Sequence, residues 1–87
     1  MKFKEAFVNF VSGLEESDLE GMARSKLSIG YSSDEFYVGD ASTIRRDGGD
    51  VVYDSEGEAD HEITVERLRE RLIGDAEVLT EGIRHAD

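Results

Sequence analysis

The chain has 87 residues, 21 acidic and 10 basic, which gives a formal net charge of −11 and a pI of about 4.5. It has no cysteine, which excludes disulfides, thiolate nucleophiles and cysteine-bound metals, and no apolar run approaches the about 20 residues of a transmembrane helix. Length and composition predict one small acidic domain over 1–87 with a thin core. Because small secreted domains usually carry disulfides, we expect a cytoplasmic protein.

Helical periodicity dominates the first part of the chain. Apolar residues recur every three or four positions from Phe3 to Leu14, which predicts an amphipathic helix over 2–15 whose phenylalanines anchor the core. Ser17 and Glu20 have the spacing of a capping box. A short second helix is therefore predicted, with Ser17 as its N-cap.

After Lys26 the helical period ends, and apolar residues alternate with small or polar ones. The predicted strands, in chain order, are 27–31, 36–38, 43–46 and 51–53. A turn is predicted at 32–35, and Asp-Gly-Gly-Asp at 47–50 predicts a hairpin because glycine readily adopts the positive φ of a tight turn. We expect an antiparallel meander of three or four strands with one polar face.

Helical signals return near the C-terminus. Thr64 is the predicted N-cap of a helix that directs Leu68 and Leu72 inward, and Gly74 is predicted to end it, with Asp75 starting another. The order of the elements predicts an α+β fold: an N-terminal helix or two, an antiparallel three- to four-stranded meander, and a C-terminal helical region packed on one sheet face.

The negative charge is concentrated in the predicted sheet. Residues 34–62 hold two bases and ten acids, a net charge of −8, whereas 1–33 and 63–87 carry −1 and −2. Six of the acids from Asp50 to Glu62 have even numbers, and in an extended chain they would share one face about 6.6 Å apart. We expect Arg45 and Arg46 to bridge neighbouring carboxylates. The candidate partner-binding residues are Asp34, Glu35, Asp50, Asp54, Glu56, Glu58, Asp60 and Glu62.

No motif predicts a catalytic, cofactor or metal site. The oxygen-rich run 54–62 has its glycine at the wrong position for a calcium-binding EF-hand loop, although weak association of Ca²⁺ or Mg²⁺ is open. His61 and His85 have no further nitrogen or sulfur ligands to complete a zinc site. A merely solvated face and a salt-adapted surface remain alternative interpretations of the acidic segment.

Charge decides which partners are expected. A chain of net charge −11 is repelled by nucleic acids and anionic membranes and attracted to basic protein surfaces. We therefore predict a non-enzymatic module that docks on a basic, nucleic-acid-binding surface as a nucleic-acid mimic or inhibitor. Small acidic nucleic-acid mimics encoded by phages are similar in size and composition, but they share no motif with this chain. The alternative is a structural or assembly subunit, a homo-oligomer joined through its helices and their phenylalanine stripe.

Overall fold

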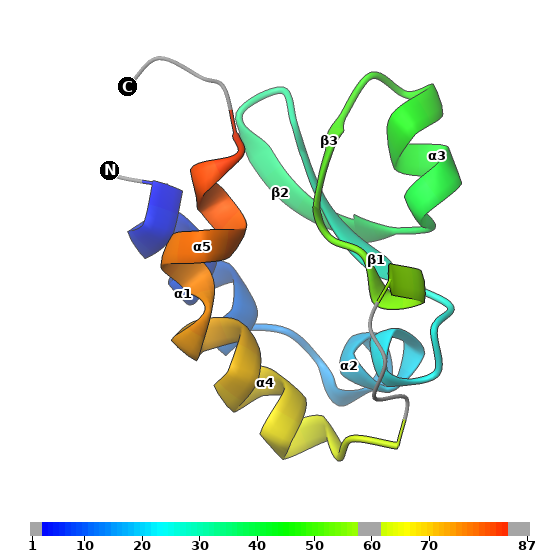
Figure 1. The fold of residues 1–87 in the computed structure, drawn as a ribbon, viewed down its shortest axis with the longest axis vertical. Helices are drawn as coiled ribbons and strands as arrows, with labels where there is room; N and C mark the ends of the chain where they lie inside the picture. The colour runs from blue at the N-terminus through cyan, green and yellow to red at the C-terminus, as the bar shows by residue number, and fades with distance from the viewer. Residues whose placement is uncertain (1–2, 58–61, 84–87) are drawn as a thin grey trace.

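Three antiparallel strands form the centre of the structure, a computed structural model that describes residues 3–57 and 62–83 (Figure 1). The elements are, in chain order, α1 (Phe3–Ser12), α2 (Glu16–Ala23), β1 (Ser28–Ser32), β2 (Glu35–Gly39), α3 (Ala41–Arg46), β3 (Asp50–Tyr53), the short 3-10 helix η1 (Ser55–Gly57), α4 (Val65–Gly74) and α5 (Ala76–Glu81). The predicted α+β class is confirmed, with helices at both ends of the chain and an antiparallel sheet between them.

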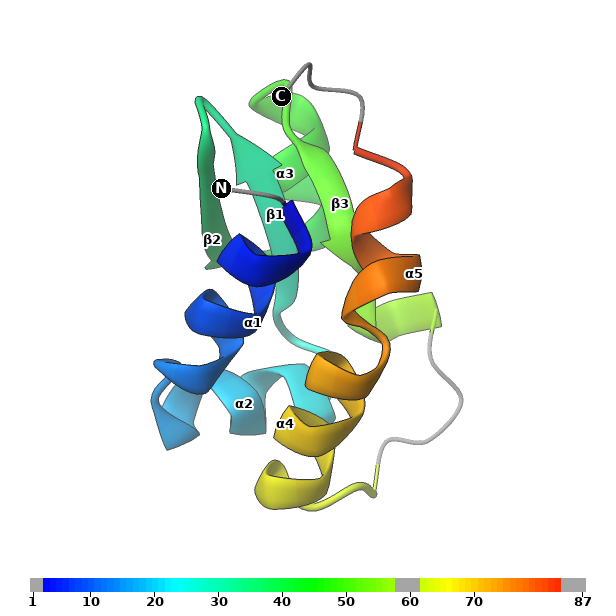
Figure 2. The ribbon, with the colours of Figure 1, turned by 90° about the vertical axis from the view of Figure 1, so that its left-hand side faces the viewer.

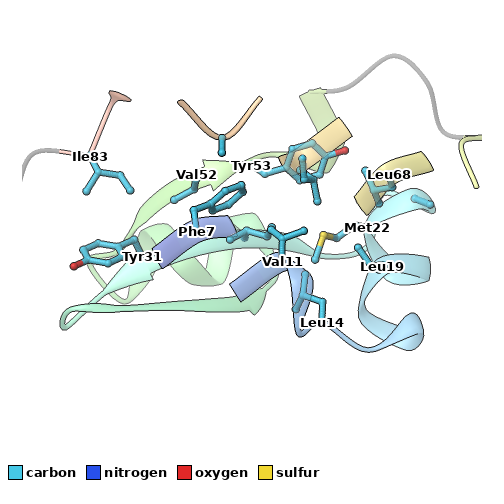
Figure 3. Close-up of a cluster of buried hydrophobic side chains, with 14 residues drawn as sticks. Phe7, Val11, Leu14, Leu19, Met22, Tyr31, Val52, Tyr53, Leu68 and Ile83 are labelled. Atoms are coloured by element: carbon cyan, nitrogen blue, oxygen red, sulfur yellow. The ribbon is translucent and has the colours of Figure 1, made fainter. Parts of the chain in front are cut away.

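One face of the sheet and the helices α1, α4 and α5 enclose the main core (Figures 2 and 3). Phe7 and Val11 of α1 are completely buried, as are Leu19 of α2 and Leu68 of α4. Consecutive residues Val52 and Tyr53 both belong to this cluster, because a register irregularity between β1 and β3 interrupts the normal alternation of side chains.

The phenylalanines of α1 pack within their own chain, which confirms their predicted role as core anchors. Phe3 meets the ring of Tyr31 edge-on at 5.2 Å between ring centroids, and Phe7 and Phe10 lie 5.5 and 5.8 Å from Phe36. Aromatic pairs at these distances add to the stability gained from burying their area. The phenylalanine stripe of α1 therefore contributes to the core of its own chain.

The predicted strand at 43–46 is wrong, because this segment belongs to α3. Asp40 caps the N-terminus of α3 by accepting a hydrogen bond from the backbone N–H of Ser42 at 2.8 Å. Gly48, at φ +80°, ends the helix in a Schellman motif: its N–H donates to Arg45 and the next N–H, that of Gly49, donates to Ile44. The glycines that predicted a hairpin at 47–50 therefore form a helix C-terminus.

This helix also changes how the strands are connected. The order in the sheet is β2-β1-β3, so β2 and β3 are joined by a crossover through α3, and consecutive pairing continues only as far as the β1–β2 hairpin. Ile44 packs α3 onto the face that was predicted to be polar, against Gly30 of β1. A Cβ atom at Gly30 would lie 2.7 Å from Ile44, so only glycine permits this close approach.

Candidate functional site

The sheet register brings three of the predicted partner-binding residues to one end of the sheet. Asp34 lies in the turn of the β1–β2 hairpin, and Glu35 begins β2 opposite Ser32. Asp50 begins β3 on the other side of β1, opposite Tyr31. Since neighbouring strands lie about 4.8 Å apart, the backbones of Glu35 and Asp50 are separated by about 10 Å. We call Asp34, Glu35 and Asp50, all exposed to solvent, the hairpin-end carboxylates.

The hairpin turn itself has a defined geometry. Ser33 and Asp34 have φ values of 52° and 65°, the positive values that the two central residues of a type I′ turn require. This turn follows the right-handed twist of the strands, and short polar side chains such as that of Asp tolerate the left-handed region. The turn predicted at 32–35 is confirmed, and it places Asp34, which is exposed, between β1 and β2.

Asp54 and Glu56 lie at the opposite end of β3. Asp54 is half-buried and pairs with Arg45 of α3 at 3.3 Å, which confirms for Arg45 the predicted bridging of a carboxylate. Its other carboxylate oxygen accepts a hydrogen bond from the N–H of Glu56 at 3.0 Å. Glu56 itself is exposed. Asp54 thus has a structural role, whereas Glu56 presents its charge to solvent.

A pair of buried serines holds this second acidic segment onto the sheet. The hydroxyl oxygen of Ser28 accepts a hydrogen bond from the N–H of Ser55 at 3.1 Å, and the two side-chain oxygens lie 3.3 Å apart. Both residues are 1% exposed. Because an unpaired polar group is costly to bury, this contact fixes the place at which η1 leaves β3.

β3 ends at Tyr53, so the even-numbered acids after it do not continue along an extended strand. Residues 55–57 form η1, in which side chains do not alternate between two faces, so the 6.6 Å spacing does not continue through Asp54 and Glu56. Glu58 and Asp60 lie outside the described residues, and Glu62, after that gap, is exposed. The structure thus brings together Asp34, Glu35 and Asp50, and places Asp54 and Glu56 at the other end of the sheet.

Asp40 adds a further exposed negative charge between β2 and α3. Hydrogen bonds from the side chain and backbone of Ser42 hold the pKa of Asp40 below its usual value. Asp40 was not among the predicted binding residues. Aspartate is a favoured N-cap residue, but only Ala41 and Ile44 are apolar among the six residues of α3, too few to mark a helix start in the sequence.

Tyr37 carries the most unusual polar atom of this region. Its side chain points to the α3 face, where a Cβ atom at Gly49 would lie 2.7 Å from the hydroxyl oxygen. The residue as a whole is only half-buried, but the hydroxyl is shielded from solvent and has no hydrogen-bond partner within the described part of the chain. Burial, with a smaller contribution from the charge of Asp47, raises the pKa of Tyr37 above its ordinary value.

Two surface hollows lie away from these acids. One is lined by Lys4, Glu5, Val8 and Asn9 of α1, and the other by Ile63, Arg67, Glu70 and Arg71 near the start of α4. Within residues 3–57 and 62–83, no three His, Asp or Glu side chains are placed to hold a metal ion, and no helix is long and apolar enough to cross a membrane.

No protein-family model, curated protein or solved structure matches this chain.

Proposed function

We propose that this protein is a non-enzymatic interaction module in which the hairpin-end carboxylates and Glu56, together called the sheet carboxylates, dock on a basic surface of a partner protein. The observation that carries the proposal is exposure: seven of the eight described carboxylates in residues 34–62 face solvent, and Asp54 is the half-buried exception. Carboxylates on the same protein surface repel one another, and a cationic partner surface would reduce that repulsion. The same surface attracts a partner at long range and speeds association.

A basic surface that normally binds nucleic acid is the partner we favour. Such surfaces present several Lys and Arg side chains arranged to contact successive phosphates. The hairpin-end carboxylates lie at the start of β3 and Glu56 lies in η1 beyond its end, so the negative charges are separated by at least the length of this four-residue strand, about 10 Å. A partner occupied in this way could not bind its nucleic acid, so the module would act as an inhibitor.

Capture of partners at low salt tests this proposal. The immobilised protein is incubated with cell extract, and bound proteins are eluted first with duplex DNA and then with high salt. We expect DNA to release a partner that binds nucleic acid, because both ligands compete for the same cations. Partners released only by detergent, and not by DNA or salt, would contradict the proposal.

Two variants with the same net charge distinguish the effect of the sheet carboxylates from the effect of total charge. The sheet-acid variant carries Asp34→Asn, Glu35→Gln, Asp50→Asn and Glu56→Gln, and the helix-acid variant carries Glu5→Gln, Glu20→Gln, Glu70→Gln and Glu81→Gln. Each set removes four exposed negative charges and changes the net charge from −11 to −7. We expect at least tenfold weaker binding for the sheet-acid variant and less than threefold for the helix-acid variant. Equal losses in the two variants would show that no particular face is used.

A further inference from the structure

The sheet ends at β2, and this edge is open. β2 pairs with β1 over all five of its residues, and no described strand lies on its other side (Figure 2). Four of the five residues of β1 are buried, whereas none of the five in β2 is. An edge of this kind exposes a row of unpaired backbone N–H and C=O groups that another chain can pair with.

The hairpin geometry identifies which backbone groups face outward. In a two-residue type I′ hairpin, the pair that closes the turn exchanges both hydrogen bonds, and hydrogen-bonded pairs then alternate with non-bonded ones along the strands. The closing pair here is Ser32 and Glu35, so Glu35, Tyr37 and Gly39 direct their backbone groups toward β1. Phe36 and Val38 therefore present their N–H and C=O groups to the open edge.

The opposite edge of the sheet is less suited to pairing. β3 has only four residues, its register with β1 is irregular, and it packs against α5. Short, bulged and covered strands are the usual protection against added strands. β2 is longer, has a regular register, and contains no proline or lysine to discourage pairing.

Side chains and charges around β2 define what would fit there. Phe36 and Val38 are half-buried on the core face, and Phe10 of α1 lies against Phe36, so apolar side chains of an added strand would extend this cluster. Glu35 lies at one end of the edge and Asp40 follows the other, and β2 contains no base. A centred antiparallel pairing of two copies would bring Glu35 of each copy toward Asp40 of the other, and like charges would oppose it.

We propose that the open edge of β2 binds an extended segment of the partner in which apolar residues alternate with Lys or Arg. The backbone groups of Phe36 and Val38 receive the added strand, its apolar side chains continue the Phe10–Phe36 cluster, and its cations lie near Glu35 and Asp40. This inference rests on the proposed function and specifies how the basic partner is held.

A short basic peptide tests the edge directly. The probe is a peptide of about seven residues that alternates valine and lysine, long enough to cover a five-residue strand. It is titrated into the isotopically labelled protein, and amide chemical shifts and hydrogen exchange are followed. We expect the largest shifts and the greatest slowing of exchange at the amides of Phe36 and Val38.

Two control peptides separate backbone pairing from charge. The first has the same sequence with its central amides N-methylated, which removes donors and keeps the charge, and the second replaces lysine by glutamate. We expect the N-methylated peptide to bind at least about tenfold more weakly than the unmodified peptide, and the acidic peptide not to bind. Equal binding of the N-methylated peptide would overturn the edge proposal.

Substitution of Val38 gives an independent test. Val38→Pro removes an outward N–H without removing a bond to β1, since proline is tolerated on edge strands where the N–H faces solvent. We expect binding of the basic peptide to fall by about tenfold, whereas Val38→Thr, which keeps the N–H, changes it by less than threefold. If Val38→Pro unfolds the protein, the N-methylated peptide still decides the question with the unmodified chain.

The outcomes distinguish this proposal from the proposed function. If the basic peptide binds wild type and Val38→Pro equally but loses affinity for the sheet-acid variant, docking through charge stands and the edge proposal fails. Hydrogen exchange at the amides of Phe36 and Val38 that slows as the protein concentration rises, without peptide, would identify a second copy as the occupant. That result would overturn the proposal that a basic segment of a partner binds this edge. Failure of the DNA-competed capture would instead remove the proposed function itself.

Discussion

Arg69 joins two helices that are far apart in the sequence. Its guanidinium donates hydrogen bonds to the carbonyl oxygens of Val11, Ser12 and Leu14, at 2.5, 3.1 and 2.8 Å. These carbonyls lie at the C-terminus of α1, where helical carbonyls lack partners and a cation interacts favourably with the helix dipole. Arg69 thus caps α1 from α4, with its side chain partly buried.

Loss of this cap should be costly. Arg69→Met keeps an unbranched apolar stem but removes the guanidinium donor from three carbonyls, of which that of Val11 also accepts from the N–H of Leu14, and we expect the free energy of unfolding to fall by about 2 kcal/mol. Arg67→Met, at an exposed position of the same helix, removes the same charge and should change it by less than about 0.5 kcal/mol. Urea unfolding of the two variants measures the difference, and equal destabilisation would show that the contacts of Arg69 contribute little.

The hydroxyl of Tyr37, in contrast, is expected to lower the stability of the fold. Replacement by Phe removes a hydroxyl that is shielded and without a partner in the described residues, so we expect the free energy of unfolding to rise by about 1 kcal/mol at neutral pH. The raised pKa of Tyr37 means that the folded state disfavours the phenolate. Stability is therefore retained below the ordinary tyrosine pKa of about 10 and falls as the pH rises above it.

Thermal unfolding of wild type and Tyr37→Phe between neutral pH and about pH 11 checks both parts of this prediction. The variant should be more stable at neutral pH, and the gap should widen at alkaline pH. A destabilised variant would show that the hydroxyl has a partner that stabilises the fold.

At the scale of the helices, the two predicted N-caps have different outcomes. Thr64 is confirmed, because its hydroxyl accepts a hydrogen bond from the N–H of Arg67 at 3.3 Å. The prediction for Ser17 is wrong: α2 begins at Glu16, its N-cap is Glu15, and Ser17 lies inside the first turn. Ser17 and Glu20 therefore both lie within the helix, and no side chain caps its N-terminus within the described residues.

Alanine substitutions measure this difference. Thr64→Ala should lower the free energy of unfolding by about 1 kcal/mol because a cap is lost. Ser17→Ala should leave it unchanged or raise it slightly, since alanine has the higher helix propensity. Denaturant midpoints of the two variants suffice, and a clear loss in Ser17→Ala would restore the capping box.

The strands and helices with strong periodicity could be predicted from the sequence, and α3 could not. Six residues are too few to show a helical period, and the β-branched Thr43 and Ile44 favour a strand. The glycines at 48 and 49 fit a hairpin and a helix C-terminus equally well. What separates these alternatives is tertiary: Ile44 finds its place over Gly30, on the far side of the sheet.

For the candidate site too, the sequence shows some features and only the folded molecule shows the others. Concentration of the acids in residues 34–62 is visible in the sequence, because charge can be counted along a chain. Their grouping is not, since Glu35 and Asp50 come together only through pairing of β2 and β3 with β1. The contact of Ser28 with Ser55 and the cap by Arg69 span 27 and at least 55 positions, so local patterns contain no sign of them.

The dependence of partner binding on salt concentration shows whether the exposed sheet carboxylates attract a basic surface. The affinity of the captured partner is measured over a series of salt concentrations for wild type, the sheet-acid variant and the helix-acid variant. We predict that wild-type affinity falls steeply as salt increases, that the helix-acid variant keeps this slope, and that the sheet-acid variant loses most of it. An affinity that is independent of salt, or a slope that the sheet-acid variant retains in full, would mean that these carboxylates do not attract the partner.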